Sequence, residues 1–102
     1  MGRYSIADSA AADLAHLWDD YIERGGAEVN ANRLVDNLLE NFQNLAAFPD
    51  IGTPRHYLPT GQLAFPHRDH MIFYSKNADG VEIVHVLYGR MDFASYFSEA
   101  EH

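Results

Sequence analysis

The stretch MIFYSKNADGVEIVHVLY, residues 71–88, decides the fold of this 102-residue chain. Two runs rich in β-branched, aromatic and other apolar residues, 71–74 and 81–88, flank a polar segment at residues 76–80. Such runs are typical of strands, and an Asp-Gly pair between them is a strong hairpin signal. We therefore predict a β-hairpin in which Asp79 and Gly80 adopt positive φ at the turn.

Two further strands are predicted outside this hairpin. Residues 62–65, Gln-Leu-Ala-Phe, form a short apolar run after the turn-rich stretch 49–54, which contains two prolines and a glycine. Residues 3–6 form another short run at the start of the chain. The sequence therefore contains four candidate strands, three of them consecutive.

The region between the first two strands has helical spacing. Apolar residues recur at three- and four-residue steps, which places them on one face of a helix. The first stripe consists of Leu14, Leu17, Trp18, Tyr21 and Ile22, and the second of Ala31, Leu34, Leu38, Phe42 and Leu45.

Polar and helix-breaking residues mark the ends of the two helices. Asp8 or Ser9 is a natural N-cap for the first helix, and the glycines at 25–26 are expected to end it. The dipeptide at 48–49, Phe-Pro, stops the second helix. Four acidic residues of the first helix are assigned to its solvent faces: Asp13, Asp19, Asp20 and Glu23.

These elements predict one α+β domain spanning residues 1–102. Its order is β-α-α-β-β-β, with a helical hairpin packed on an antiparallel sheet and a short C-terminal tail or helix. The hairpin is expected to pack on the sheet through seven apolar residues: Leu14, Leu17, Trp18, Leu34, Leu38, Phe42 and Leu45.

The charge balance argues against a nucleic-acid-binding protein. The chain has seven Lys and Arg residues and fifteen Asp and Glu residues, which gives a formal net charge of −8. Proteins that grip a phosphate backbone normally present a basic face, so no direct nucleic-acid binding is expected. Residues 1–50 hold nine acids and three bases, whereas residues 51–102 hold six and four. An anion-facing surface is therefore expected in the second half.

The chain has no cysteine, which favours the reducing cytoplasm for so small a domain. No apolar run approaches the roughly 18 residues needed to cross a bilayer, so no membrane partner is expected.

The cluster at 67–70, His-Arg-Asp-His, is the densest group of potential metal ligands. Two histidines three residues apart outside a helix are not a characteristic metal-binding spacing, and zinc would need further ligands. The sequence also lacks a phosphate-binding glycine loop and a nucleophile elbow. We therefore expect neither a metal nor a cofactor, and read these residues as part of a surface loop.

A second group combines scarce positive charges with aromatic side chains near the end of the sheet: Arg68, Tyr88, Arg90, Asp92 and Tyr96. Arginine beside aromatic rings suits the recognition of carboxylates or phosphates. Surface ion pairs with Asp69 or Asp92 are an equally simple explanation of the arginines.

Four segments together resemble the ParE/RelE superfamily of toxins from type II toxin–antitoxin systems, and the resemblance covers nearly the whole chain. They are ADLAHLWDDYI at 12–22, LAAFPDIGTPR at 45–55, FPHRDHMIFY at 65–74 and IVHVLYGRMD at 83–92. No single segment is specific to this superfamily, but the order and spacing of the four together are.

The resemblance to the ParE branch implies a toxin that a cognate ParD-like antitoxin neutralises and that inhibits DNA gyrase by binding rather than by catalysis. The arginines of the less acidic half, Arg55, Arg68 and Arg90, are the expected antitoxin contacts. The expected target contacts are Arg90, Phe93, Tyr96 and Phe97.

Two alternatives remain open from the sequence. The RelE branch cleaves messenger RNA on the ribosome, and Arg68, Arg90 and Tyr96 would then act as catalytic residues. A single lysine in the whole chain leaves little to hold RNA, which favours the gyrase-type interpretation. The third class is a scaffold that binds an antitoxin and is not toxic.

Overall fold

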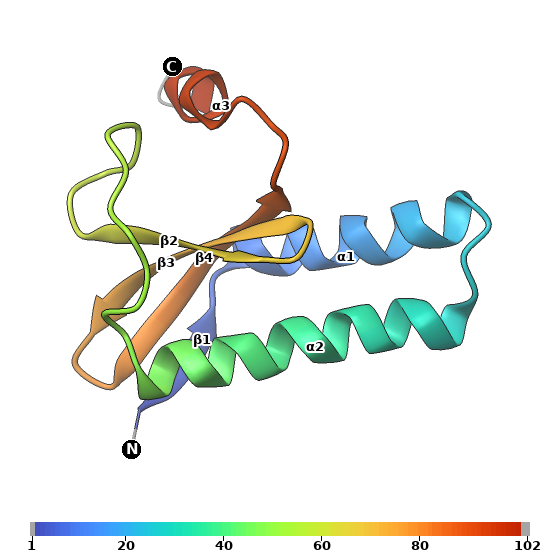
Figure 1. The fold of residues 1–102 in the computed structure, drawn as a ribbon, viewed down its shortest axis with the longest axis horizontal. Coiled ribbons are helices and arrows are strands. Elements are labelled where there is room, and N and C mark those ends of the chain that lie inside the picture. The colour runs from blue at the N-terminus through green and yellow to red at the C-terminus, as the bar shows by residue number, and fades with distance from the viewer. Residues whose placement is uncertain (1, 101–102) are drawn as a thin grey trace.

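The computed structural model describes residues 2–100 and has the predicted order of elements, followed by a short C-terminal helix (Figure 1). The elements are β1 (Arg3–Ile6), α1 (Asp8–Glu23), α2 (Glu28–Ala47), β2 (Gln62–His67), β3 (His70–Asn77), β4 (Gly80–Tyr88) and α3 (Phe93–Ala100). The α+β class is confirmed. No helix among residues 2–100 is long and apolar enough to cross a bilayer.

The four strands form one sheet in the order β1-β4-β3-β2. The pairs β2–β3 and β3–β4 are antiparallel, as predicted. In contrast, β1 lies parallel to β4, with Arg3 opposite Gly80 and Ile6 opposite Ile83. The helical hairpin forms part of the long connection that a parallel pair requires. The sheet is therefore mixed rather than wholly antiparallel.

The turn between β3 and β4 is shorter than predicted, since Asn77 already pairs with Gly80 across it. Of the two residues expected to adopt positive φ, only Gly80 does so, at 151°, and the prediction for Asp79 is wrong. A Cβ at position 80 would lie 2.0 Å from the Arg3 carbonyl oxygen. Glycine is needed here because β1 and β4 approach each other closely.

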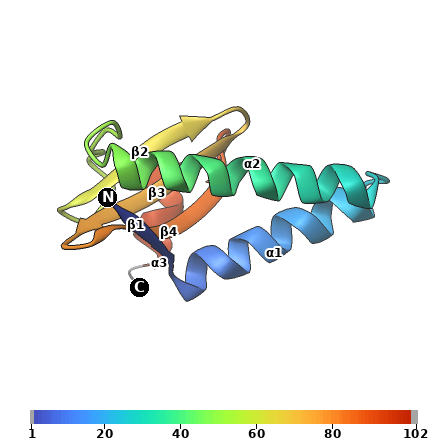
Figure 2. The ribbon, with the colours of Figure 1, turned by 90° about the horizontal axis from the view of Figure 1, so that it is seen from below.

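The two faces of the sheet are covered by different elements. Helices α1 and α2 lie on one face, whereas α3 lies on the other, together with Tyr57 and Leu58 of the loop at residues 48–61 (Figures 1 and 2). Each face has its own apolar cluster. The helix-side cluster includes Leu38, Phe42, Leu45, Tyr74 and Ile83. The α3-side cluster consists of Leu58, Ala64, Phe73, Leu87, Phe93 and Phe97.

The helical hairpin extends beyond the end of the sheet (Figure 2). Leu38, Phe42 and Leu45 are fully buried against the sheet, and Leu14 and Leu17 pack at the margin of this cluster. Trp18 and Leu34 are only partly buried and lie outside it, so the prediction was wrong for these two residues. The Trp18 indole N–H instead donates to Asn32 Oδ1 across the two helices, at 3.0 Å.

The buried side chain of Tyr74 holds the segment at residues 48–52, which follows α2. The Tyr74 hydroxyl donates to the Pro49 carbonyl oxygen at 2.7 Å and accepts from the Gly52 N–H at 2.9 Å. Burial raises the pKa of Tyr74, so the phenol stays protonated and keeps its donor. This pair of bonds fixes the direction in which the chain leaves α2.

Helix α1 completes the edge of β4 where β1 ends. The Ser9 hydroxyl donates to the Val84 carbonyl oxygen, and Asp13 Oδ2 accepts from the Val86 N–H at 3.0 Å. Ala7 occupies the N-cap position, so the prediction of Asp8 or Ser9 was wrong. Asp13 was also assigned to the wrong face, because its carboxylate faces β4. Side chains of α1 thus satisfy backbone groups that β1 is too short to reach.

Replacing Leu38 with Ala should lower the free energy of unfolding by about 2–5 kcal/mol, because the side chain is 0% exposed and its loss leaves a cavity. Chemical denaturation measures the change, with Val29→Ala as the control because Val29 is 63% exposed. A loss below about 0.5 kcal/mol, typical of surface positions, would contradict the assigned packing.

Asp13→Ala should cost about 1–3 kcal/mol, because it leaves the Val86 N–H without its acceptor. Asp13→Asn should lose less, since the amide oxygen can still accept from that group. Asp19→Ala, on an exposed face of the same helix, is the control in thermal and chemical denaturation. Equal effects of Asp13→Ala and Asp19→Ala would refute the role of Asp13.

Candidate functional site

The fold brings Arg68 and Arg90 to the same end of the sheet. Arg68 lies in the β2–β3 turn, and Arg90 follows the end of β4. His70 pairs with Tyr88, and the Gly89 N–H donates to the Asp69 carbonyl oxygen at 2.7 Å. These contacts place the two arginine-bearing segments side by side. We call the surface formed by Arg68, Tyr88 and Arg90 the arginine end.

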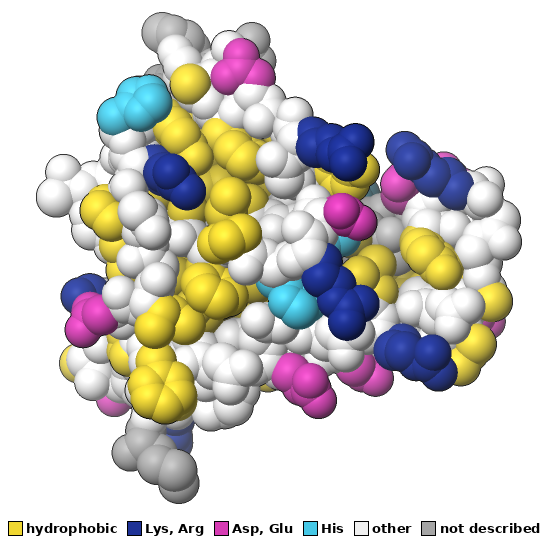
Figure 3. Space-filling view, viewed as in Figure 1, with side chains coloured by type: hydrophobic (Ala, Val, Ile, Leu, Met, Phe, Trp, Pro, Cys, Tyr) yellow, Lys and Arg dark blue, Asp and Glu magenta, His cyan; other side chains and the backbone are white. Residues whose placement is uncertain are grey.

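Both arginines of this surface are exposed, and neither forms an ion pair with the side chains of residues 2–98. Figure 3 shows basic side chains over this end of the molecule and the projecting helices, interspersed with acidic ones, and further basic side chains on the opposite side. The alternative of a salt bridge to Asp92 is not realised. The Asp92 carboxylate instead accepts from the Ser95 hydroxyl at 2.8 Å and the Ser95 N–H at 3.3 Å. These bonds cap α3 and lower the pKa of Asp92.

Arg68 has an unusual backbone conformation. Its φ of 55° lies in the left-handed region, and within residues 2–100 it is the only residue other than glycine with a positive φ. His67 pairs with His70, so Arg68 is the first residue of a two-residue hairpin turn, a position that requires a positive φ and that glycine occupies at lower cost. The turn holds the Arg68 side chain at the exposed tip of the β2–β3 hairpin.

Arg55 lies away from the arginine end. It belongs to the loop at residues 48–61, where its carbonyl oxygen accepts from the Leu58 N–H at 3.1 Å. In Figures 1 and 2 this loop and the β2–β3 turn lie at opposite ends of the sheet. The three arginines expected to bind one partner therefore form two separate exposed sites.

Two of the expected target contacts, Phe93 and Phe97, are packed onto the sheet. They are 9% and 8% exposed, and both rings meet Phe73 edge-on with centroids 5.1 Å apart. Tyr57 from the 48–61 loop stacks on the pair at 6.1 and 5.7 Å. A partner can reach these two rings only if α3 moves away from the sheet.

Tyr96 packs beside a histidine rather than beside the arginines. Its ring lies edge-on to His85, with centroids 5.8 Å apart, and His85 Nδ1 lies 2.8 Å from Asp13 Oδ2. Burial, and secondarily the Asp13 charge, raise the pKa of Tyr96. His85 precedes the end of β4 by three residues, about 10 Å along a strand. Within the described residues no hydrogen bond joins Tyr96 to Arg68 or Arg90.

The sequence interpretation missed this Asp13–His85–Tyr96 arrangement. A signal was present, because Asp13 is three residues after Ala10 and four before Leu17, which places it on the buried side of α1. Nothing in the sequence identified His85 as its partner, since 72 residues separate the two.

The histidines of the 67–70 cluster face each other across the β2–β3 turn. Burial lowers the pKa of both His67 and His70, which favours neutral imidazoles. Among the side chains of residues 2–98, no three from His, Asp or Glu gather closely enough to hold a metal ion.

Comparison with known proteins identifies the family. A family model described as the ParE toxin of type II toxin-antitoxin system, parDE, matches residues 4–93. Toxin ParE3 of Caulobacter vibrioides is 32% identical over 96 residues, covering 93% of this chain and 94% of that protein. Toxin ParE1 of Mycobacterium tuberculosis is 30% identical over 91 residues, covering 88% and 92%.

A solved structure of the chromosomal ParDE TA system from P. aeruginosa has the same fold. Its TM-score is 0.73 at 20% identity, and the match covers 86% of this chain and 96% of that one. The family match over most of the chain, two relatives at 30% identity or above and the shared fold agree. The chain described here therefore belongs to the ParE toxin family of type II toxin–antitoxin systems.

Proposed function

We propose that this chain is a toxin that inhibits DNA gyrase by binding it, and that a cognate ParD-like antitoxin neutralises it. The observation that carries the proposal is the match to ParE toxins over residues 4–93. It is combined with two arginines at one end of an acidic molecule that form no ion pair with the side chains of residues 2–98. The proposed site of action is the cytoplasm, where the chromosome is replicated.

The antitoxin is proposed to contact the arginine end with carboxylate side chains. Arg68 and Arg90 are exposed and side by side, so one acidic segment can pair with both. Charge-assisted bonds from a guanidinium to a carboxylate are about twice as strong as neutral ones, and more so once a partner excludes water. Arg55 is proposed as a second, separate antitoxin contact on the loop at 48–61.

Gyrase is proposed to contact Arg90 together with Tyr96 of α3. Contacts to the buried Phe93 and Phe97 are proposed to form as α3 moves away from the sheet. Binding without bond cleavage needs no assembled catalytic group, which agrees with the separation of Tyr96 from the arginines. The formal charge of −8 and the presence of a single lysine disfavour binding to RNA. These features support the gyrase target over the ribosome.

One observation favours the alternative of a ribosome-dependent endoribonuclease. A carboxylate that holds one nitrogen of an imidazole leaves the other nitrogen oriented, as a general base requires. Asp13 and His85 have this relation, and Tyr96 lies against the same ring. The cations that would stabilise the cleaved phosphate are not beside this pair, so we rank this function second.

Charge reversal at the arginine end should weaken antitoxin binding. Arg68→Glu and Arg90→Glu are each expected to raise the dissociation constant, measured by calorimetry, about tenfold or more, equivalent to about 1.4 kcal/mol. Arg55→Glu tests the second contact, and Arg33→Glu, an exposed arginine of α2, is the matched control.

A further variant separates loss of binding from loss of fold. Arg68→Gly removes the guanidinium but suits the positive φ of this position, so stability should not fall. Weaker antitoxin binding at unchanged stability would support a direct contact. Unchanged affinity for the antitoxin in both Arg68→Glu and Arg90→Glu would exclude the arginine end as the antitoxin-binding surface.

The target is tested by two assays run side by side on the purified chain. Supercoiling of relaxed plasmid by gyrase should be inhibited, and Arg90→Ala should relieve the inhibition while Arg33→Ala should not. Translating ribosomes should yield no specific messenger RNA cuts. Specific cuts with normal supercoiling would establish the ribonuclease instead, and silence in both assays would establish a non-toxic scaffold.

A further inference from the structure

Helix α3 is held on the sheet by packing of its side chains. Among the side chains of residues 2–98 and the backbone of α3, no hydrogen bond or ion pair joins this helix to the strands or to the loop after α2. Phe93 and Phe97 instead pack on Phe73, and Tyr57 stacks on both. Because the hydrophobic effect is non-directional, burial of these rings favours docking without fixing the position of the helix.

His85 is the polar ring that touches α3. It pairs with Phe73 across β3 and β4, so its side chain lies on the same face of the sheet as the helix. Its ring meets Tyr96 at a centroid distance of 5.8 Å with 90° between the planes, and Phe97 at 5.9 Å with 73°. Such edge-on contacts depend on the orientation of both rings. The position of α3 therefore depends on how the imidazole is turned.

Asp13 of α1 fixes that orientation. Its Oδ2 lies 2.8 Å from His85 Nδ1, and the same oxygen accepts from the Val86 N–H at 3.0 Å. A carboxylate can only accept hydrogen bonds, so the proton is on Nδ1 of the imidazole and is donated to Asp13. This bond selects one tautomer and one rotation of the ring. Asp13 thus acts on α3 through His85, without touching the rings of Phe93 or Phe97.

We propose that Asp13 and His85 form a latch that keeps α3 docked and thereby controls access to Phe93 and Phe97. The first part concerns the chain alone. The second part rests on the proposed function, in which gyrase reaches these two rings as α3 moves away from the sheet. The docked form is then a restrained form of the toxin, and loosening the latch raises the fraction of chains whose rings are available.

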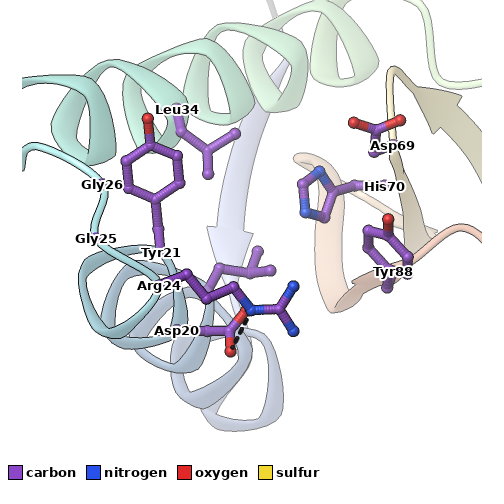
Figure 4. Close-up of a pocket in the computed structure, with 10 residues that line it drawn as sticks. Asp20, Tyr21, Arg24, Gly25, Gly26, Leu34, Asp69, His70 and Tyr88 are labelled. Atoms are coloured by element: carbon purple, nitrogen blue, oxygen red, sulfur yellow. Dashed lines mark hydrogen bonds and ion pairs between the residues drawn. The ribbon is translucent and has the colours of Figure 1, made fainter.

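The latch is separate from the groove between the projecting helical hairpin and the end of the sheet. Figure 4 shows Leu34 and His70 on opposite sides of that groove. Asp13, His85 and the residues of α3 do not line it. Leu34→Ala, at a partly buried position of α2, therefore serves as a control for a general loss of stability.

The test is amide hydrogen exchange of the full chain, free of antitoxin, followed by nuclear magnetic resonance. His85→Ala and Asp13→Ala should each speed exchange in α3 by about 2–10-fold relative to β3, the effect of losing one or two such contacts. General destabilisation speeds both elements together, so the ratio isolates undocking. Leu34→Ala should leave the ratio unchanged. Ser9→Ala, which also removes a bond from α1 to β4, should do the same.

Two further variants separate the latch from a purely structural role of Asp13. Asp13→Asn keeps an acceptor for the imidazole and should restore most of the protection of α3. The double variant Asp13→Ala/His85→Ala should exchange in α3 no faster than His85→Ala alone, because Asp13 acts through the ring. A role confined to the Val86 N–H would instead give additive effects, which would overturn the proposal.

The supercoiling assay tests the consequence for gyrase. His85→Ala should inhibit at a toxin concentration lower by about the factor by which it speeds exchange in α3, since both depend on the undocked fraction. Faster exchange with unchanged or weaker inhibition would overturn the control of access. No inhibition by the unmodified chain would refute the gyrase target instead, and the exchange ratios would still decide whether the latch exists.

A variant that fails to fold does not remove the test. His85→Phe keeps a ring against Tyr96 but cannot donate to Asp13, so it should also speed exchange in α3 relative to β3. An unchanged ratio in His85→Phe, or in both His85→Ala and Asp13→Ala, would overturn the latch. Equal acceleration of α3 by Ser9→Ala would do so as well, because the effect would then belong to the edge of β4 in general.

Discussion

The packing of the C-terminal half of α2 onto the sheet is the interaction on which the rest of the structure depends. Leu38, Phe42 and Leu45 are buried against a cluster that includes Tyr74 and Ile83 from β3 and β4. Burying side chains of this size contributes about 1.5–3 kcal/mol each. Because the contact involves only this half of the helix, the other end of the hairpin projects past the sheet. The partial exposure of Trp18 follows from that projection.

The two faces of the sheet serve different purposes. The helix face holds the larger core, and Asp13 and Ser9 complete its β4 edge where β1 stops. The opposite face is covered by α3 and by Tyr57, through a small group of stacked and edge-on rings. Between the two faces, at the end of the strands, the β2–β3 turn and the end of β4 present Arg68 and Arg90 together. The candidate functional surface is thus a product of strand pairing rather than of sequence proximity.

Much of this fold could be predicted from the sequence, because its signals are local. The helical spacing from Leu14 to Leu45 and the glycines and proline that end the helices required no knowledge of the tertiary structure. The parallel pairing of β1 with β4 could not be predicted in this way, because residues 3–6 carry no mark of their partner. The buried face of Asp13 became meaningful only once β4 lay beside α1. From the sequence, Phe93 and Phe97 could equally have formed a contact surface or packed against the sheet. Only the structure, in which both rings meet Phe73, distinguishes these possibilities.

We propose that this ParE-family chain binds its antitoxin at the arginine end. Hydrogen–deuterium exchange of the chain alone and in complex with its antitoxin tests this most directly, since it reports burial residue by residue without a substitution. The account predicts that exchange slows in the complex at the amides of residues 67–70 and 88–91. Unchanged exchange in both segments, with new protection elsewhere in the chain, would contradict it.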